Sequence, residues 1–469
     1  MQGNDKQLKR GIWRMRLGYG ASDFACNLVW QMISLYLLFF YTNIMHLDAV
    51  AISVMFLVTR IIDGGTDLLV GVLVDRTNTR WGKSRPWILC GAFPFAIFAI
   101  LAFSVPDISP TGMLIYAYIT YIGLSFAYTM VNIPMASILP ALTADPQERT
   151  NLASSRVFFS FVGATVVSSS TLGLVEKFGQ GNQALGFRIV MMIFGTISCL
   201  VFIFTFFNTK ERVTIRQKEK VNIAQTLKAV FNNKPYLVFL ANIIWMFGGY
   251  TIQMGAIIYY FTYVIGSTSL ASIVATLSTL LPIISNFMVP LLSKKIIKRN
   301  IFQLGSAIQL AGLVIVFLGG VSTPIILAGV AISSLGFGIK QSIYFSMQAD
   351  PVDYSEWKSG LDVAGTMSAV NGFVGKVAMA IAGSASAALL AMGGYDANLT
   401  TQPESAQTAI TVMYIVIPVV SIVLGMITMA FYNLDTEYPK IKAELEARNT
   451  MQLKEDLNVK SKKLKAELA

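Results

Sequence analysis

The chain has 469 residues, of which 54% are hydrophobic and only 13% are charged, whereas about 25% of the residues of a soluble globular domain are charged. This composition excludes an ordinary water-soluble globule and predicts that lipid covers most of the surface. The formal net charge is +11, but the basic residues fall in short clusters between apolar runs, so they indicate membrane topology and not binding to nucleic acid.

Twelve apolar stretches, each of about 18 residues or more, predict membrane-spanning helices. The first six lie at residues 19–44, 50–74, 87–105, 112–139, 152–174 and 189–207, and the second six at residues 236–265, 270–292, 301–321, 324–347, 361–392 and 409–431. We therefore expect an all-α membrane protein with an N-terminal half at 1–209, a cytoplasmic linker at 210–234, a C-terminal half at 235–433 and a cytoplasmic tail at 434–469.

The connections between the spans alternate in charge, which tests the number of spans independently because cytoplasmic loops hold the excess of Lys and Arg. Basic residues gather before the first span, in the second connection, in the linker, in the eighth connection and in the tail; examples are Arg14, Arg16, Arg80, Lys83, Arg216, Lys218, Lys294 and Lys295. Lys177 in the fifth connection departs from this pattern. Both ends of the chain are therefore predicted to lie in the cytoplasm, with the protein in the plasma or inner membrane.

Cysteine spacing and the start of the chain exclude other classes. Cys26, Cys90 and Cys199 lie in apolar stretches without paired or metal-like spacing, so we expect neither a disulfide framework nor a zinc site. The first apolar run is too long for a removable signal peptide and has no small-residue cleavage site, so none is expected.

The loop after the second span carries Gly71, Asp75 and Arg76, followed by Arg80 and Arg85. An ordinary cytoplasmic loop explains the arginines but not the glycine and the acid at the end of the span. Together with two groups of six spans, this loop resembles the signature of the major facilitator fold, whose two halves rock about a central site. We expect the four charged residues to act in gating, as a clamp between the cytoplasmic ends of the halves in the outward-open state.

Two acids of the second span are the strongest candidates for binding a cation. An ionisable side chain at mid-membrane costs about 2.5–3.5 kcal/mol, and Asp63 and Asp67 lie four residues apart, on one face of a helix. Arg60 can neutralise Asp63 as a structural pair, which leaves Asp67 in need of a partner. A sodium ion or a proton would supply one, and Thr66 adds a hydroxyl of the kind that hard cations prefer.

Asp23 in span one and Lys376 in span eleven are candidates for binding a sugar, because a carboxylate and an ammonium group suit hydroxyls that both donate and accept hydrogen bonds. The alternative for both residues is an ion pair that joins the halves. Trp30 lies two turns after Asp23 and shares its face, so it could stack on a pyranose ring. The alternative for Trp30 is packing, the commonest role of membrane aromatics.

Several motifs along nearly the whole chain resemble the glycoside-pentoside-hexuronide cation symporter family, a branch of the major facilitator superfamily that includes the melibiose and glucuronide permeases. The motifs are the stretches from Gly18 to Asp23, Arg60 to Asp67, Thr79 to Trp87, Tyr128 to Pro134 and Ala349 to Gly360. Residues 79–86 and 132–134 look closer to the glucuronide and xyloside transporters than to the melibiose carrier.

The resemblance implies roles for particular residues. In the melibiose branch the cation is held by positions that correspond to Asp63, Thr66, Asp67 and Thr129. The sugar is held by positions that correspond to Asp23, Lys376 and, with a one-residue shift in spacing, Arg156. The acid and the tryptophan of span four are Asn132 and Ala136 here, which argues against a galactoside and leaves Asn132 and Trp30 as substrate-binding candidates.

The function expected from the sequence is symport of a glycoside, of the glucuronide or pentoside type, with sodium or a proton by alternating access. No cofactor besides the coupling ion is expected, and sodium, if it is that ion, would bind at Asp63 and Asp67. The expected partners are the sugar, the cation and the lipid bilayer, and we expect the protein to work as a monomer. A uniporter or exchanger without cation coupling is the first alternative. A membrane-embedded transferase is the second, and it would need a catalytic group that a sequence with one histidine, His46, and no acid-rich loop does not offer.

Overall fold

The computed structural model describes residues 2–143, 146–211, 230–286, 288–348, 350–359, 364–445 and 447–448. Most of the predicted linker and the end of the predicted tail, residues 212–229 and 449–469, thus lie outside the described residues. Within the described residues the regular structure is helical, apart from one isolated bridge between Thr79 and Gly82.

Several helices begin where a short polar side chain binds a free backbone N–H group, as expected for helix N-caps. Asp48 accepts a hydrogen bond from the N–H of Ala51, and Ser109 accepts one from Gly112. Asn182 does the same for the N–H of Leu185. Local polar residues therefore mark where these helices start.

The first bundle of helices runs from the N-terminus to Asn208. Its elements are α1 (Gln2–Met32), continued by the π-helical turns η1 (Ile33–Leu37) and η2 (Phe40–Ile44), α2 (Ala49–Arg76), α3 (Arg85–Ala102), α4 (Pro110–Ser137), α5 (Leu139–Leu142), α6 (Pro146–Gly179) and α7 (Gln183–Asn208).

The second bundle begins at Lys234. Its elements are α9 (Lys234–Tyr259) with η3 (Tyr260–Val264), α10 (Thr268–Asn286), α11 (Val289–Leu292), α12 (Lys298–Leu318), α13 (Thr323–Met347), α14 (Asp350–Ser359), α15 (Ala364–Met392), α16 (Glu404–Thr411), η4 (Val412–Val416) and α17 (Ile417–Ala430).

Eleven helices of the described residues are long and apolar enough to cross a membrane. The segment formed by α1, η1 and η2 passes along the same bundle and covers the first predicted span, residues 19–44. Large apolar side chains such as Leu318, Phe207 and Ile61 are exposed by 76%, 68% and 72%, which is the pattern of a surface that faces lipid and not water. The predicted fold class, an all-helical membrane protein, is confirmed.

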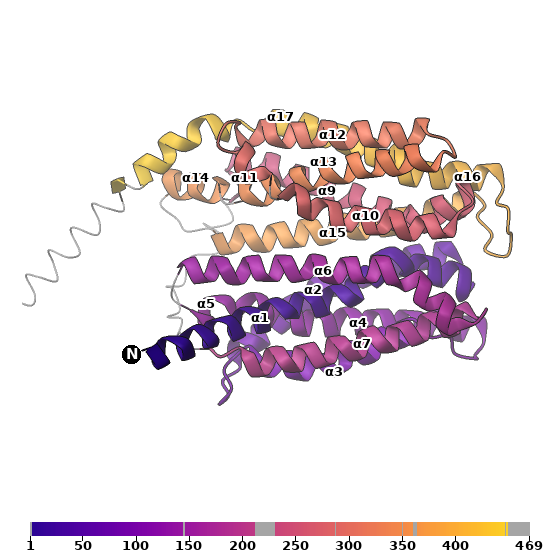
Figure 1. Ribbon diagram of the computed structural model, residues 1–469, viewed down its shortest axis with the longest axis horizontal. Helices are drawn as coiled ribbons and strands as arrows, with labels where there is room; N and C mark the ends of the chain where they lie inside the picture. Colours follow the sequence, from indigo (N-terminus) through magenta and orange to yellow (C-terminus); the bar gives the residue numbers. More distant parts are fainter. Residues whose placement is uncertain are drawn as a thin grey trace, which may run out of the picture.

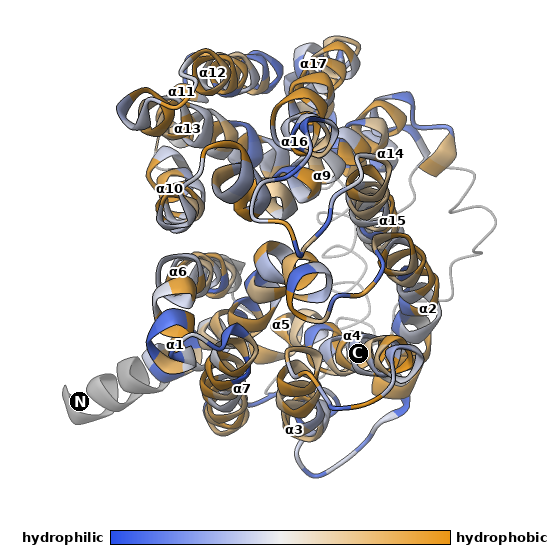
Figure 2. Ribbon diagram, turned by 90° about the vertical axis from the view of Figure 1, so that its right-hand side faces the viewer, coloured by the Kyte–Doolittle hydropathy of each residue, from blue (hydrophilic) through white to orange (hydrophobic). Residues whose placement is uncertain are grey.

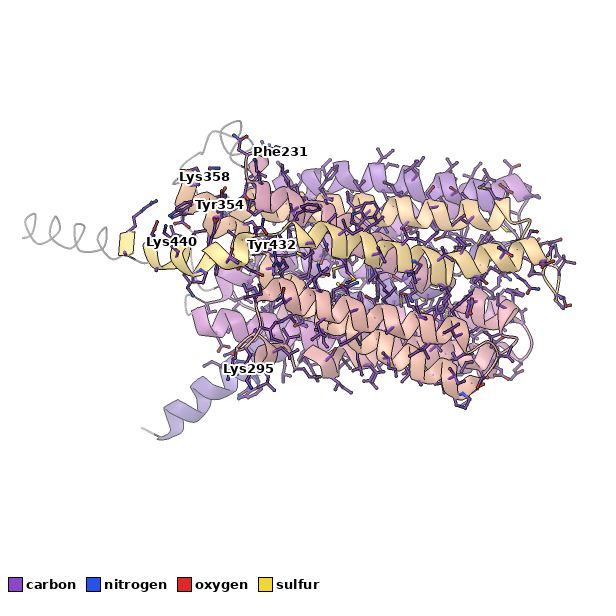
Figure 3. All side chains as sticks on the ribbon, turned by 90° about the horizontal axis from the view of Figure 1, so that it is seen from above. Phe231, Lys295, Tyr354, Lys358, Tyr432 and Lys440 are labelled. Atoms are coloured by element: carbon purple, nitrogen blue, oxygen red, sulfur yellow. The ribbon has the colours of Figure 1, made fainter. Side chains whose placement is uncertain are left out.

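Figures 1 and 2 show the two bundles side by side, with their helices running along the long axis of the molecule. The start of α1 and the segment after α17 lie at the same end, which we call the terminal end, and the opposite end is called the far end. Figure 3 shows Lys295, Lys358 and Lys440 together at the terminal end. These three lysines thus lie at one end of the bundle, the pattern expected of a cytoplasmic side, whereas Lys177 and Arg188 lie toward the far end, at the end of α6 and the start of α7.

The observed helices differ from the predicted spans at positions where a helix begins or ends inside or outside an apolar stretch. The stretch at 270–292 is not one helix, because α10 ends at Asn286 and the short α11 begins at Val289. The last pass begins at Glu404 and not at residue 409, because an acidic residue in a first turn is favourable next to the helix N-terminus. A search for apolar stretches also misses the polar helix α14, which lies outside the apolar run.

Candidate functional site

A cavity of about 480 Å³ lies between the two bundles and is lined by residues of α1, α6, α9, α10, α13 and α15. This volume falls within the range of small-molecule sites, about 300–1,000 Å³. Its polar lining residues include Asp23, Asn27, Gln31, Thr251 and Gln341. The cavity therefore combines side chains from both halves of the chain, as a carrier that alternates between two openings requires.

Asp23 and Arg156 face each other across α1 and α6 at this cavity. The guanidinium donates through Nε and Nη2 to the two carboxylate oxygens, both at 2.7 Å, and through Nη1 to the hydroxyl of Tyr19 at 3.2 Å. Asn27 lies one turn after Asp23 and donates to Ser160 of α6 at 2.8 Å. The pair is bidentate and partly exposed, at 19% for Arg156 and 17% for Asp23, so it fixes orientation while leaving polar atoms open to the cavity.

Asp63 on α2 is held from two sides within the first bundle. Arg60 donates to Oδ2 at 3.1 Å, and Ser125 of α4 donates to Oδ1. Only 4% of the Asp63 side chain is exposed. A carboxylate this deeply buried needs such compensation, and Arg60 with Ser125 provides it.

Asp67 lies one turn further along α2 and has a partner from each bundle. Thr129 of α4 donates to Oδ1 at 2.9 Å, and Lys376 of α15 forms an ion pair with Oδ2. Among the ion pairs between described residues, this is the one that joins the two bundles. Lys376 thus supplies the positive partner that the second acid needs.

The remaining predicted site residues lie as follows. The hydroxyl of Thr66 donates to the backbone carbonyl of Asp63 at 3.1 Å. Trp30 stacks on Tyr128, with ring centroids 5.3 Å apart, and also lines the central cavity. Asn132 is half-buried on α4 and is not among the cavity-lining residues. Trp30 therefore packs and lines the cavity at once, so its two interpretations are compatible.

The predicted gating residues make their described contacts within the first bundle. Arg85 donates to the carbonyl of Phe206 at 3.2 and 2.6 Å, and Arg80 lies 4.9 Å from the ring of Trp81. Arg76 ends α2 and is exposed, and the side chain of Asp75 lies outside the described residues. In this conformation these arginines make no described ion pair with the second bundle.

Two groups at these sites are not predicted from the sequence. Ser125 lies four residues before Thr129, the same spacing as Asp63 to Asp67. This equal spacing is the signal that could have paired the two hydroxyls of α4 with the two acids of α2. Glu211 accepts hydrogen bonds from the N–H groups of Lys83 and Ser84 at 2.9 and 2.8 Å. An acid beside the start of a helix is the signal that could have indicated it.

Hydrogen bonds between the bundles gather toward the far end. Thr42 shares a hydrogen bond of 2.7 Å with Tyr259, and Asn43 donates to Tyr263 at 2.6 Å. Further bonds join Ser53 to Ser384 and Ser168 to Thr279, at 2.7 and 2.9 Å. The halves are thus sealed at the far end, and the Asp67–Lys376 pair adds a charged link between them.

Comparison with known proteins places the chain among sugar carriers. The family model described as MFS/sugar transport protein matches residues 18–436. The isoprimeverose transporter of Lactiplantibacillus pentosus is 38% identical over 447 residues, which cover 94% of this chain and 92% of that protein. The glucuronide carrier protein homolog of Escherichia coli (strain K12) is 31% identical, covering 94% of this chain and 97% of that protein.

Solved structures support the fold. A bacterial homolog of the human lysosomal transporter Spinster, in an inward-facing and unoccupied conformation, has a TM-score of 0.63 at 13% identity and covers 92% of this chain and 98% of that one. The nucleoside transporter NupG has a TM-score of 0.61 at 16% identity, with 89% and 99% covered. At these identities the likeness concerns the fold alone.

Proposed function

This chain belongs to the family of MFS/sugar transport proteins, and we propose that it moves a glycoside across the membrane together with a sodium ion or a proton. The resemblance to the glycoside symporters is confirmed by the relatives. The chain is therefore a multi-pass sugar transporter and not an enzyme.

The observation that carries the proposal is the ladder formed by Asp63 and Asp67 on α2 with Ser125 and Thr129 on α4. It sets carboxylate and hydroxyl oxygens on two neighbouring helices of one bundle, and such oxygens are the ligands of hard cations. Lys376 reaches Asp67 from the other bundle. A cation arriving at the ladder would compete with Lys376 for the same carboxylate oxygen.

This competition gives a physical basis for coupling. Without a cation, Lys376 neutralises Asp67 and the empty carrier can close and return. With a cation at Asp67, the ammonium group of Lys376 is free to donate to a sugar hydroxyl, since Met379, one turn further along α15, lines the cavity. Cation and sugar would then raise each other's affinity by the same factor.

The sugar would bind where Asp23, Arg156 and Asn27 present hydrogen-bonding groups beside Trp30. The ring of Trp30 offers an apolar face of the kind that sugars stack on. The printed names of the relatives, isoprimeverose transporter and glucuronide carrier homolog, favour a pentose-containing or uronic glycoside as substrate. Asn132 does not line the cavity, so it would affect which substrate binds only indirectly, by changing the position of α4.

The orientation of the protein in the membrane follows from the distribution of its basic residues. If the basic terminal end faces the cytoplasm, both ends of the chain are cytoplasmic and the seal at the far end makes this conformation inward-facing. Asp75, Arg76, Arg80 and Arg85 would form their clamp in the opposite, outward-open state. We infer that the carrier acts as a monomer in the cell membrane, since each monomer contains a complete cavity.

The test is uptake by proteoliposomes that contain the full chain, with isoprimeverose, xylobiose and phenyl glucuronide as probes and with sodium and proton gradients imposed separately. We expect accumulation above the external concentration with one gradient, and its loss in Asp67→Asn with exchange of sugar retained. Thr411→Val is the control, because that hydroxyl binds its own helix outside the cavity. Sugar that equilibrates at the same rate with either gradient or with none would instead identify a uniporter.

A further inference from the structure

Lys340 on α13 is the one Lys or Arg that is buried among the described residues, and 5% of it is exposed. Its ammonium group donates to Oε1 of Gln309 on α12 at 2.6 Å and lies 5.5 Å from the ring centroid of Phe337. Both partners are neutral, and no ion pair between described residues includes Lys340. A buried charge without an opposite charge is costly, so a negative partner is expected close to this group.

A side pocket of about 20 Å³ lies next to Lys340 inside the second bundle. It is lined by residues of α9, α10, α12, α13 and η4, of which α10, α12 and α13 lie side by side in Figure 2. Its volume exceeds the space of about 10–15 Å³ that one water molecule needs. Gln309 and Phe337, the two residues next to the ammonium group, both line this side pocket. The charge of Lys340 is thus separated from the side pocket by a single side chain.

The bond to Lys340 fixes the orientation of the Gln309 amide, because an ammonium group can only donate and must meet the carbonyl oxygen. The Nε2 group at the other end of the amide makes no hydrogen bond within the described part of the chain, although only 5% of Gln309 is exposed. Unlike fully enclosed unpaired atoms such as Oγ of Ser306, this Nε2 atom keeps accessible surface. Since Gln309 lines the side pocket, its two N–H groups are donors for an occupant of that pocket.

Hydroxyl groups add to the donors of the side pocket. Ser333 and Ser334 of α13 line it and are 7% and 6% exposed. The described residues that line the side pocket include no Asp or Glu. A hydroxyl can donate or accept, but an amide donor whose oxygen is bound to a buried ammonium group favours a negatively charged occupant.

We propose that the side pocket binds one small monovalent anion, such as chloride, as the counter-ion of Lys340. The donors are Nε2 of Gln309 and the hydroxyls of Ser333 and Ser334, and hydrogen bonds to an ion are stronger than those between neutral groups. The site lies within the second bundle, whereas the two acids proposed to bind the cation lie on α2 of the first. Phe337 lines both the side pocket and the central cavity, so the anion would lie behind the wall of the sugar site.

The experiment measures thermal unfolding of the purified full chain in detergent, with chloride replacing gluconate at constant ionic strength. Gluconate is too large for the side pocket and serves as the reference anion. A ligand that binds the folded state stabilises it, so we expect chloride to raise the Tm of the parent protein by several degrees. Lys340→Met should lose at least about two thirds of this rise, and Ser334→Ala at least about a third. Lys294→Met, which removes an exposed charge, is the matched control and should keep the full rise.

The response to chloride separates an anion site from a lysine with a purely structural role. If the parent and Lys340→Met respond equally to chloride, or if neither responds, the side pocket does not bind an anion and the proposal is wrong. If phenyl glucuronide in gluconate, and not chloride, stabilises the parent through Lys340, the anion is the carboxylate of a substrate and the free-ion site is overturned. If Lys340→Met fails to fold, Ser334→Ala decides, and an undiminished rise overturns the site. These results do not depend on sugar transport, which is tested separately.

Discussion

Lys376 forms an ion pair with a residue that lies 309 positions away in the chain. The side chains of Lys376 and Asp67 are 30% and 25% exposed, so the pair is partly desolvated. In such pairs, removing one charge costs more than removing both, because the remaining charge is left without compensation. The stability of variants can therefore reveal whether the pair forms in the membrane protein.

We predict that Lys376→Gln and Asp67→Asn each lower stability by about 1–2 kcal/mol, less than for a fully buried pair because of the partial exposure. The double variant should be less destabilised than the sum, with a coupling energy of about 1 kcal/mol or more. Thermal unfolding in detergent measures this cycle. Lys440→Gln is the control, since its pair with Glu444 spans 4.0 Å and is 80% and 46% exposed. If the loss of stability in the double variant equals the sum of the two single losses, Lys376 and Asp67 do not form the ion pair.

A second prediction concerns Glu148 at the terminal end, outside the membrane spans. Arg16 donates to both of its oxygens, at 2.7 and 2.5 Å, and this hydrogen bonding holds the pKa of Glu148 below its usual value. A lowered pKa in the folded protein means that the contribution to stability is complete above the ordinary Glu value of about 4.3 and is lost as the pH falls through the lowered pKa.

Glu148→Gln should therefore reduce stability by up to about 1 kcal/mol at pH 7, and the difference from the parent protein should vanish as the pH falls below about 4. Parallel thermal unfolding of both proteins across this pH range checks it. Glu176→Gln, on the exposed surface at the other end of the same helix, should show no such trend. A difference that persists at low pH would mean that packing, not charge, explains the effect.

At the level of helices, the seal of the far end depends on a few hydrogen bonds between helix ends. Tyr259 at the end of α9 bonds Thr42 of η2 at 2.7 Å. One such bond contributes about 1 kcal/mol, and a carrier poised between two openings responds to energies of that size.

We predict that Tyr259→Phe shifts the equilibrium about fivefold toward the conformation open at the far end. Spin-label distances between the connections at residues 45–48 and 266–267 would measure the shift. Tyr260→Phe is a matched control, because Tyr260 stacks on Tyr414 within the second bundle at 4.5 Å. Equal distance distributions for Tyr259→Phe and the parent would show that this bond does not hold the seal.

The helices were largely predictable from sequence, because a run of apolar residues long enough to cross lipid has few other structures open to it. The pass formed by α7 was predicted at 189–207 and is observed at Gln183–Asn208. The predicted boundary falls several residues late because Arg188 interrupts the apolar run inside the helix, five residues after the helix begins at Gln183. The break between α10 and α11 is not predicted because the polar pair Ser285 and Asn286 is too short to interrupt the apolar stretch at residues 270–292, although Pro290 at the start of α11 is a signal that could have indicated it.

The site was predictable only where partners share a helix. The spacing of Asp63 and Asp67 predicts a common face, and both bond to α4. By contrast, the sequence offers an ion pair between Asp23 and Lys376 as one alternative, whereas in the structure each has another partner, Arg156 and Asp67. Pairing between helices depends on how the bundles dock, which no spacing within one helix encodes.

For the molecule as a whole, alternating access requires a second set of contacts at the terminal end. Arg85 binds the carbonyl of Phe206 in the present conformation, and a carbonyl partner of this kind can be exchanged for an acid at modest cost. The clamp residues should therefore matter for the rate of conformational change more than for binding.

We predict that Arg76→Gln combined with Arg80→Gln and Arg85→Gln slows sugar uptake at least about fivefold while the Kd for sugar stays within about twofold, since gating and not the binding site is altered. Uptake rates and calorimetric affinities on the same preparation test this. Lys295→Gln, at the terminal end but outside the clamp, is the control. Parallel losses in rate and affinity would assign these arginines to binding.

The balance of charge around the cavity has a consequence for membrane voltage. Asp23, Asp63 and Asp67 are matched one for one by Arg156, Arg60 and Lys376, so these three pairs together carry no net charge. One elementary charge crossing 100 mV exchanges about 2.3 kcal/mol with the field. The three pairs therefore make no contribution to the voltage dependence of the empty carrier's return, which is left to the buried Lys340, whose ammonium group donates to the neutral amide of Gln309. The step that carries sugar with one cation should speed up as the interior becomes negative. Solid-supported membrane recordings should show a charge movement with sugar and cation together, and a return step with a smaller voltage dependence.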